Sequence, residues 1–144
     1  MVLEENIFIE KVLPQAAFRT FSDEEMEQYR SPFRNPGEDR RAMLAWPRSL
    51  PIEGEPAEVA EVVSRNCDWL AQSDIPKLFV SGEPGTLARD RLCDIIRRWP
   101  NQTEVTVEGR KLLQEDSPEE IGKAIADFVE TTRGRGSHAS EGTT

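Results

Sequence analysis

Apolar residues recur at the spacing of an α-helix in several parts of this chain. Residues 3–13 carry a loose apolar stripe, and we expect Pro14 to end that helix because proline removes a backbone hydrogen bond and clashes with the preceding turn. A longer helix is predicted over residues 57–70, where one face is apolar. That face comprises Val59, Val62, Val63, Asn66, Cys67 and Leu70. Trp69 on the same helix is expected to lie in a core.

Another helix is indicated by the residues at its start. Ser22 and Glu25 have the spacing of a capping box, in which each side chain satisfies a backbone N–H at the helix N-terminus. Phe21 and Met26 occupy the two positions of a hydrophobic staple around that cap. The helix is predicted to run to about Tyr29, because a proline shortly afterwards disfavours further helix.

Residues 31–56 hold five prolines and two glycines, which predicts a long connection with short turns. Apolar residues within the connection argue against disorder. They are Phe33, Met43, Leu44, Trp46, Leu50 and Ile52.

The second half of the chain alternates strands and helices. Residues 77–81 and 103–107 are short apolar or β-branched runs, which predict two strands. A helix is predicted between them from apolar positions at Leu92, Ile95, Ile96 and Trp99. A last helix is predicted to begin after Ser117, which is expected to cap it with Glu120.

This strand–helix–strand–helix order predicts a parallel pair of strands with a right-handed crossover. Two parallel strands are few, since parallel sheets are buried on both faces and are normally larger. The two predicted strands therefore indicate that the chain contributes only part of a larger sheet. Residues 133–144 are polar, and we expect them, with the single histidine His138, to form a disordered tail.

Composition narrows the possible functions. The formal net charge of −9 argues against a nucleic-acid partner, because phosphate binding depends on clustered Lys and Arg. No apolar run approaches the ~18 residues that a membrane helix needs, and acids occupy the start of the chain where a signal peptide carries positive charge. Cys67 and Cys93 lack metal-ligand spacing, which favours two reduced thiols in a cytoplasmic protein with no metal and no cofactor.

Six stretches of the sequence carry a family resemblance: ENIFIEKVLP, FSDEEMEQYRSPFRNPGEDRR, WPRSLPI, IPKLFVSGEPG, WPNQTEVTVEG and LLQEDSPEEIGKAIADFV. All six resemble the haloalkane dehalogenases, which are α/β-hydrolases that displace halide from carbon with a carboxylate nucleophile. The resemblance extends over about residues 2–130. A related coelenterazine luciferase is a weaker match.

The resemblance is to the C-terminal half of that family and implies an α/β fold. Residues 1–72 would form a helical cap remnant, and residues 73–132 the last strand–helix–strand–helix of the hydrolase core, followed by the tail at 133–144. In the family, the N-terminal half supplies the aspartate nucleophile, the Trp and Asn halide donors and the glutamate that orients the catalytic histidine. We expect none of these groups within the chain.

The family's catalytic base lies in a frame of Gly-x-His, two apolar or aromatic residues, and Gln-Glu-Asp. Residues 109–116 read GRKLLQED and fit this frame, with Lys111 at the histidine position. The resemblance implies that the histidine activates the water that hydrolyses an alkyl-enzyme ester, for which it must be neutral near pH 7. An ordinary lysine has a pKa of about 10.4 and is neutral at pH 7 in only about 10⁻³ to 10⁻⁴ of molecules. Desolvation would have to lower the pKa of such an amine by roughly 3 before it could act as a base.

The resemblance also implies a set of residues that line the substrate pocket. They are Phe8, Val12, Ala16, Trp46, Pro47, Leu50, Thr86, Leu87 and Leu112. Glu83 follows the first predicted strand, where many α/β-hydrolases place the acid that orients the histidine. It is either a remaining orienting acid, paired with Lys111, or a turn residue. Glu115 and Asp116 precede a helix N-terminus, where negative charge is favourable, so we assign them a structural role.

Three interpretations of the chain remain open. It is a truncated dehalogenase-family chain that is inactive alone, a half that is completed by a separate N-terminal polypeptide, or a non-catalytic binding module that keeps the cap pocket. A completed enzyme would act on small halogenated alkanes. An unpaired sheet edge would also favour self-association.

Overall fold

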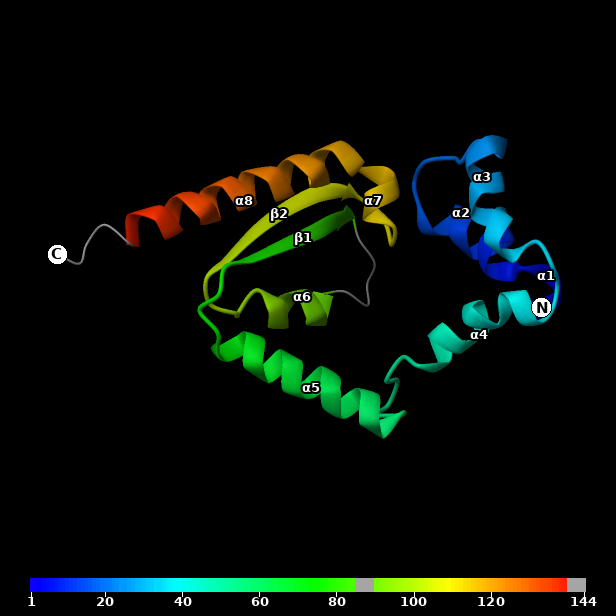
Figure 1. Ribbon diagram of the computed structural model, residues 1–144, viewed down its shortest axis with the longest axis horizontal. Helices are drawn as coiled ribbons and strands as arrows, with labels where there is room; N and C mark the ends of the chain where they lie inside the picture. The colour runs from blue at the N-terminus through cyan, green and yellow to red at the C-terminus, as the bar shows by residue number, and fades with distance from the viewer. Residues whose placement is uncertain (85–89, 140–144) are drawn as a thin grey trace. The chain divides into compact units, whose positions relative to one another are not determined.

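The computed structural model describes residues 1–84 and 90–139 of the chain. The chain divides into two compact units, Met1–Leu70 and Ala71–Thr144 (Figure 1).

The first unit is helical. Its elements are α1 (Val2–Glu5), the π-helical turn η1 (Phe8–Val12), α2 (Leu13–Ala16), α3 (Asp23–Arg30), the 3-10 turns η2 (Ser31–Phe33) and η3 (Glu38–Arg40), α4 (Arg41–Arg48) and α5 (Ala57–Gln72), whose end passes into the second unit.

The single helix predicted over residues 3–13 is wrong in its bounds. Asn6 adopts left-handed backbone dihedrals, with φ 51°, and this conformation ends α1. Pro14 does not end the helical segment, because it lies in the first turn of α2, where a proline is tolerated.

The capping box predicted at the start of α3 is confirmed. The Glu25 backbone N–H donates to the Ser22 hydroxyl at 3.2 Å, and the Ser22 N–H donates to the Glu25 carboxylate at 2.8 Å. Phe21 and Met26 are both buried and pack with Ile9 and Ala17 in the core of this unit.

The prediction of a connection with short turns over residues 31–56 is wrong for α4. Residues 41–45 read RAMLA, which are strong helix formers. Pro47 lies inside the last turn, where its missing N–H removes one backbone hydrogen bond of the helix. Before α4, the buried Arg40 ties the turns together by donating to four backbone carbonyls. These belong to Leu3, Glu4, Phe33 and Arg34.

The apolar face predicted for α5 exists in the sequence but is not buried in the structure. None of the residues of α5 is buried, and Trp69 is 58% exposed. The expectation that Trp69 lies in a core is therefore wrong for the described residues.

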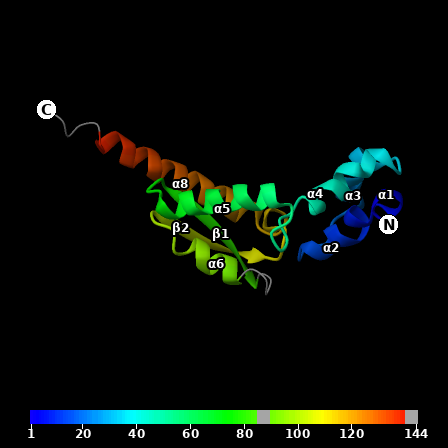
Figure 2. The same cartoon turned by 90° about the horizontal axis from the view of Figure 1, so that it is seen from below.

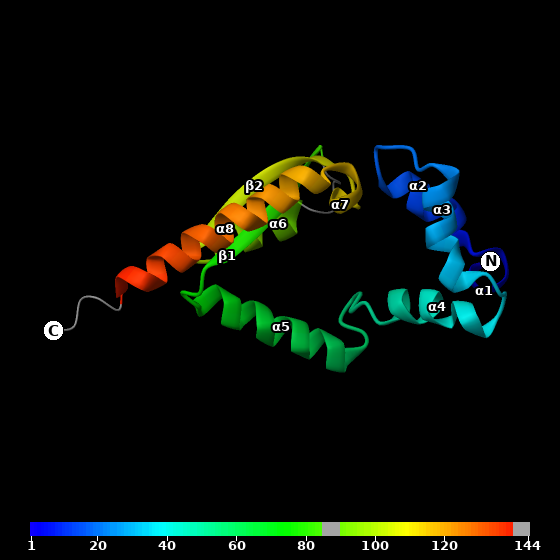
Figure 3. The same ribbon diagram turned by 45° about the horizontal axis from the view of Figure 1, so that its top comes forward.

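The second unit contains a two-stranded parallel sheet with helices on both faces. Its elements are β1 (Lys77–Pro84), α6 (Asp90–Ile96), β2 (Gln102–Gly109), α7 (Leu113–Asp116) and α8 (Pro118–Ala139). The strands pair in parallel from Lys77 opposite Gln102 to Pro84 opposite Gly109, as the sequence predicted. Figures 1 and 2 show α8 on one face of the sheet and α6 on the other, and Figure 3 shows α8 running along the strands.

Several of the predicted ends differ in this unit. β1 continues past residue 81 to Pro84, and β2 spans Gln102–Gly109 and not only residues 103–107. The helix predicted to reach Trp99 ends at Ile96, and Trp99 lies in the following turn. The last helix continues to Ala139, so residues 133–139, which include His138 and were predicted to be a disordered tail, are helical. Extension of an existing helix needs no new nucleation step, so the glycines lower the helix propensity of this end without ending α8 before Ala139.

Candidate functional site

The two residues considered for a catalytic role lie at the carboxyl ends of the strands, with Glu83 near the end of β1 and Lys111 just after β2. Glu83 and Glu108 are register partners, so their side chains lie on the same face of the parallel pair. Both are exposed beside an open depression of ≈ 500 Å³, which is also lined by Pro84, Thr106 and Val107. Immediately beyond this edge, the chain leaves β2 and forms the loop that carries Lys111.

The loop of residues 109–117 is held at both of its ends. The Arg110 backbone N–H donates to the Asp116 carboxylate at 3.0 Å, and the Ser117 hydroxyl donates to the Glu108 carbonyl at 2.7 Å. Ser117 was predicted to cap the last helix with Glu120. That cap stays a prediction, and the bond that the structure gives to the hydroxyl is the one to Glu108.

Gly109 lies at the end of β2, where the side chains of the returning loop pack closely against it. A Cβ atom at this position would lie 2.8 Å from Leu113 Cδ2 and 3.1 Å from Asp116 Oδ2. To admit a larger residue, the Leu113 methyl group would have to move and the Asp116 side chain would have to give by a few tenths of an ångström.

Lys111 lies exposed between these two fixed ends. Within residues 1–84 and 90–139, it has no hydrogen bond or ion pair, and the predicted pairing with Glu83 does not form. Leu112, the pocket residue predicted next to the base position, is half-buried at the start of α7. The arrangement presents a cationic side chain to water at the end of two parallel strands.

The remaining predicted pocket residues lie in the first unit or outside the described residues. Phe8 and Val12 belong to η1, Ala16 ends α2, and Trp46 and Pro47 belong to α4. Ala16 is buried, whereas Trp46 is 69% exposed.

Leu50 follows α4 and is exposed. Thr86 and Leu87 lie outside the residues that the structure describes. The assignment of all nine predicted residues to a substrate pocket stays a prediction.

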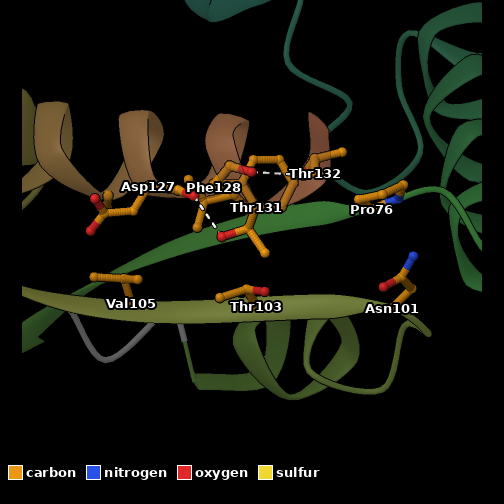
Figure 4. Close-up of a pocket in the computed structure, with 10 residues that line it drawn as sticks. Pro76, Asn101, Thr103, Val105, Asp127, Phe128, Thr131 and Thr132 are labelled. Atoms are coloured by element: carbon orange, nitrogen blue, oxygen red, sulfur yellow. Dashed lines mark hydrogen bonds between the residues drawn. The ribbon is translucent and has the colours of Figure 1, made fainter. Parts of the chain in front are cut away.

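A separate cavity of ≈ 290 Å³ lies between α8 and the amino ends of the strands (Figure 4). Its wall comprises Pro76, Leu78, Asn101, Thr103, Val105, Ala124, Asp127, Phe128, Thr131 and Thr132. The two threonines on α8 donate to carbonyls of their own helix, Thr131 to Asp127 at 2.8 Å and Thr132 to Phe128 at 2.7 Å. This cavity is at the opposite end of the strands from Lys111, and no sequence pattern indicated it.

The sequence is 58% identical over 134 residues to a haloalkane dehalogenase of Mycolicibacterium smegmatis, a match that covers 92% of this chain and 43% of the relative. It is 39% identical over 132 residues to a coelenterazine h 2-monooxygenase of Renilla reniformis, covering 90% of this chain and 42% of the relative. No protein-family model matches the chain.

Solved structures give the same result. The crystal structure of a haloalkane dehalogenase from Bradyrhizobium elkani aligns with a TM-score of 0.86 and 37% identity, and the match covers 94% of this chain and 47% of that one. The fold is therefore part of an α/β fold of the hydrolase type. The chain is a homologue of the haloalkane dehalogenases and matches their C-terminal half, which confirms the resemblance found in the sequence. It spans less than half the length of the curated relatives that it matches.

Proposed function

We propose that residues 1–132 form the cap segment and part of the core of a haloalkane dehalogenase-like hydrolase. The core part includes the loop of residues 109–116, which has the position of the family's catalytic base. The observation that carries the proposal is the frame of residues 109–116 at the carboxyl end of β2, in a chain 58% identical to a haloalkane dehalogenase. In this proposal, residues 1–72 are the cap and residues 73–132 belong to the hydrolase core. The separation of the chain into two compact units at Leu70 and Ala71 supports that division.

The reaction of the family has two steps, and the proposal assigns this chain to the second. A carboxylate oxygen attacks the carbon that bears the halogen, the carbon–halogen bond breaks, and halide leaves with the bonding electrons. Water then attacks the resulting ester, gives its proton to a base, and releases the alcohol. We propose that the attacking carboxylate and the halide donors come from outside residues 1–144, and that Lys111 takes the position of the base.

A lysine at this position favours a chain that does not complete the second step. An ammonium ion has no lone pair with which to accept a proton from water. Lys111 is exposed, so water can solvate its charged form. This observation also favours the second candidate function, a non-catalytic binding or complementing module that needs a separate N-terminal half.

The proposed substrate is a small halogenated alkane, bound by the predicted pocket residues once the site is complete. We further propose a cytoplasmic location, because Cys67 and Cys93 are both free thiols and that compartment keeps thiols reduced. Within residues 1–84 and 90–139, the structure has no helix with the length and apolarity that crossing a membrane would require.

Halide release by the purified 144-residue chain tests this proposal. We expect no release above the buffer background from 1-chlorobutane or 1,2-dibromoethane, because the displacement has no attacking group. Release that scales with protein concentration and survives repurification would contradict the proposal. The same assay with a separately produced N-terminal half of a dehalogenase should give at most one halide per protein, whereas sustained turnover would show that Lys111 serves as the base.

A further inference from the structure

We propose that Asp116 is a positioning residue for the side chain at position 111, an inference that rests on the proposed function of the 109–116 loop. Asp116 Oδ2 accepts a hydrogen bond from the backbone N–H of Arg110 at 3.0 Å. The bond fixes the Gly109–Arg110 peptide, one residue before the position from which the side chain at 111 projects. It joins the two ends of the loop across six positions of sequence.

A second bond closes the loop next to the first. Ser117 is 5% exposed, and its hydroxyl donates to the carbonyl of Glu108 at 2.7 Å. Buried polar groups with satisfied hydrogen bonds hold a unique geometry. Residues 108 and 110 on the strand side are therefore tied to residues 117 and 116 on the helix side.

The packing at Gly109 is independent evidence for this arrangement. The space where a Cβ would lie is 3.1 Å from Asp116 Oδ2 and 3.2 Å from Asp116 Cβ, so the side chain of Asp116 packs directly against the end of β2. Its carboxylate accepts a hydrogen bond from the N–H of Arg110, just after the end of β2, in addition to any role at a helix N-terminus. A helix-capping role alone would not place it there.

The consequence for chemistry is geometric. A base must lie within about 2.6–3.2 Å of the proton that it accepts, and a displacement of about 1 Å can slow a reaction by about 100-fold. Asp116 touches neither substrate nor water in this scheme, and it acts by holding the backbone at position 110.

Hydrogen exchange on the full 144-residue chain tests the positioning role without any activity. Asp116→Ala should speed exchange of the amides at 110–112 about tenfold or more, because it removes the acceptor, while the amides of β2 keep their protection. Asp116→Asn keeps an oxygen acceptor and should retain the protection at 110. Glu119→Ala, which removes an exposed carboxylate nearby on α8, is the matched control and should change nothing. Unchanged exchange at 110–112 in Asp116→Ala, or an equal loss across β2, would overturn the proposal.

A second measurement separates this inference from the proposed function. Lys111→His chains, joined with an N-terminal half that carries the nucleophile, should form and then hydrolyse the alkyl ester. Adding Asp116→Ala should slow ester decay by about 100-fold and leave ester formation unchanged, and Asp116→Asn should restore most of the rate. If no ester forms in any variant, the proposed function fails, and the exchange data still decide the positioning role. If the ester forms and decays equally fast with Asp116→Ala, the positioning role fails.

Discussion

Arg97, in the turn after α6, forms a bidentate ion pair with Glu104 on β2. Its Nε–H donates to Glu104 Oε2 at 2.9 Å, and its Nη2–H donates to Oε1 at 2.7 Å. The hydrogen bond from Arg97 is the main reason that the pKa of Glu104 lies below its usual range, and the Ser81 hydroxyl contributes in the same direction. The pair fastens the end of the crossover to the second strand, on the face of the sheet opposite to α8.

Because the pKa of Glu104 is lower in the folded chain, the pair should make stability depend on pH. Its contribution is present above the pKa of an unfolded glutamate, about 4.3, and is lost as the pH falls through the lower folded value. In Glu104→Gln, the urea midpoint should therefore change less between pH 7 and pH 3 than in the original chain. Glu119→Gln is the control, and a pH response of Glu104→Gln equal to that of the control would contradict this assignment.

The buried Arg40 should be the residue on which the first unit most depends. It donates to Phe33 O at 2.8 Å, Leu3 O at 3.0 Å, Glu4 O at 2.5 Å and Arg34 O at 3.0 Å. Arg40→Met keeps much of the volume but leaves four carbonyls without this donor, and each such group costs about 1–3 kcal/mol when buried. We expect a loss of at least about 3 kcal/mol in the free energy of unfolding of this unit, measured by urea denaturation.

The adjacent Arg41 provides a matched control. It is exposed and pairs with Glu38 on the surface, so Arg41→Met should leave the free energy of unfolding nearly unchanged. Arg40→Lys should recover only part of the loss, because an ammonium group cannot reproduce the fork of guanidinium donors. Equal effects of Arg40→Met and Arg41→Met would show that the carbonyl contacts contribute little.

Comparison of these features shows which parts of the fold the sequence can reveal. The cap formed by Ser22 and Glu25 was predictable because both partners lie within one turn, where spacing alone determines the contact. The contacts of Arg40 were not predictable, because they reach Leu3 across 37 positions of sequence and carry no periodic signal. Contacts within one helical turn can therefore be predicted from the sequence, whereas the long-range contacts of Arg40 in the first unit cannot.

The predicted burial of the apolar face of α5 was wrong for a different reason. The amphipathic pattern of α5 indicates that one face favours an apolar partner, but it does not indicate which residues provide that partner. Val62, Val63 and Trp69 are exposed among the described residues, so a correct helix was assigned an incorrect core. The same limit applies to α6, where Leu92 and Ile95 follow the helical spacing and remain exposed.

The candidate site was partly predictable. The strand that ends at Gly109 follows from its β-branched residues, and the importance of position 111 follows from the family resemblance. The hydrogen bonds of Asp116 and Ser117 were missed, because an acid and a serine ahead of a helix already have a sufficient local explanation as caps. Only the three-dimensional return of the loop onto Glu108 and Arg110 reveals these two bonds.

Self-association is the expected result of the exposed apolar residues in the second unit. Leu92 is 56% exposed and Ile95 is 51% exposed on α6, and within the described residues each strand of the sheet has one partner only. We expect concentration-dependent oligomers in sedimentation velocity, with dye binding and weak near-UV dichroism.

Replacing both α6 residues by lysine should shift this equilibrium toward the monomer, because charge on α6 opposes apolar contact. Ile75→Lys, which changes one exposed apolar residue outside α6, should have the smaller effect. A monomeric original chain with a sharp cooperative melt would contradict the prediction.

Lys111 should convert a completed site into one that stops after its first step. With an N-terminal half that carries the nucleophile, a haloalkane can still alkylate the aspartate, because that displacement needs no base. Hydrolysis of the ester does need one, and an ammonium ion has no lone pair with which to accept a proton. Intact mass after exposure to haloalkane should therefore show the added alkyl group, with halide release ending near one equivalent.

Lys111→Arg should behave the same way, since arginine is also cationic, whereas Lys111→His should lose the adduct and turn over repeatedly. Sustained turnover by the Lys111 form without a trapped adduct would show that its amine is neutral in the completed site and acts as the base.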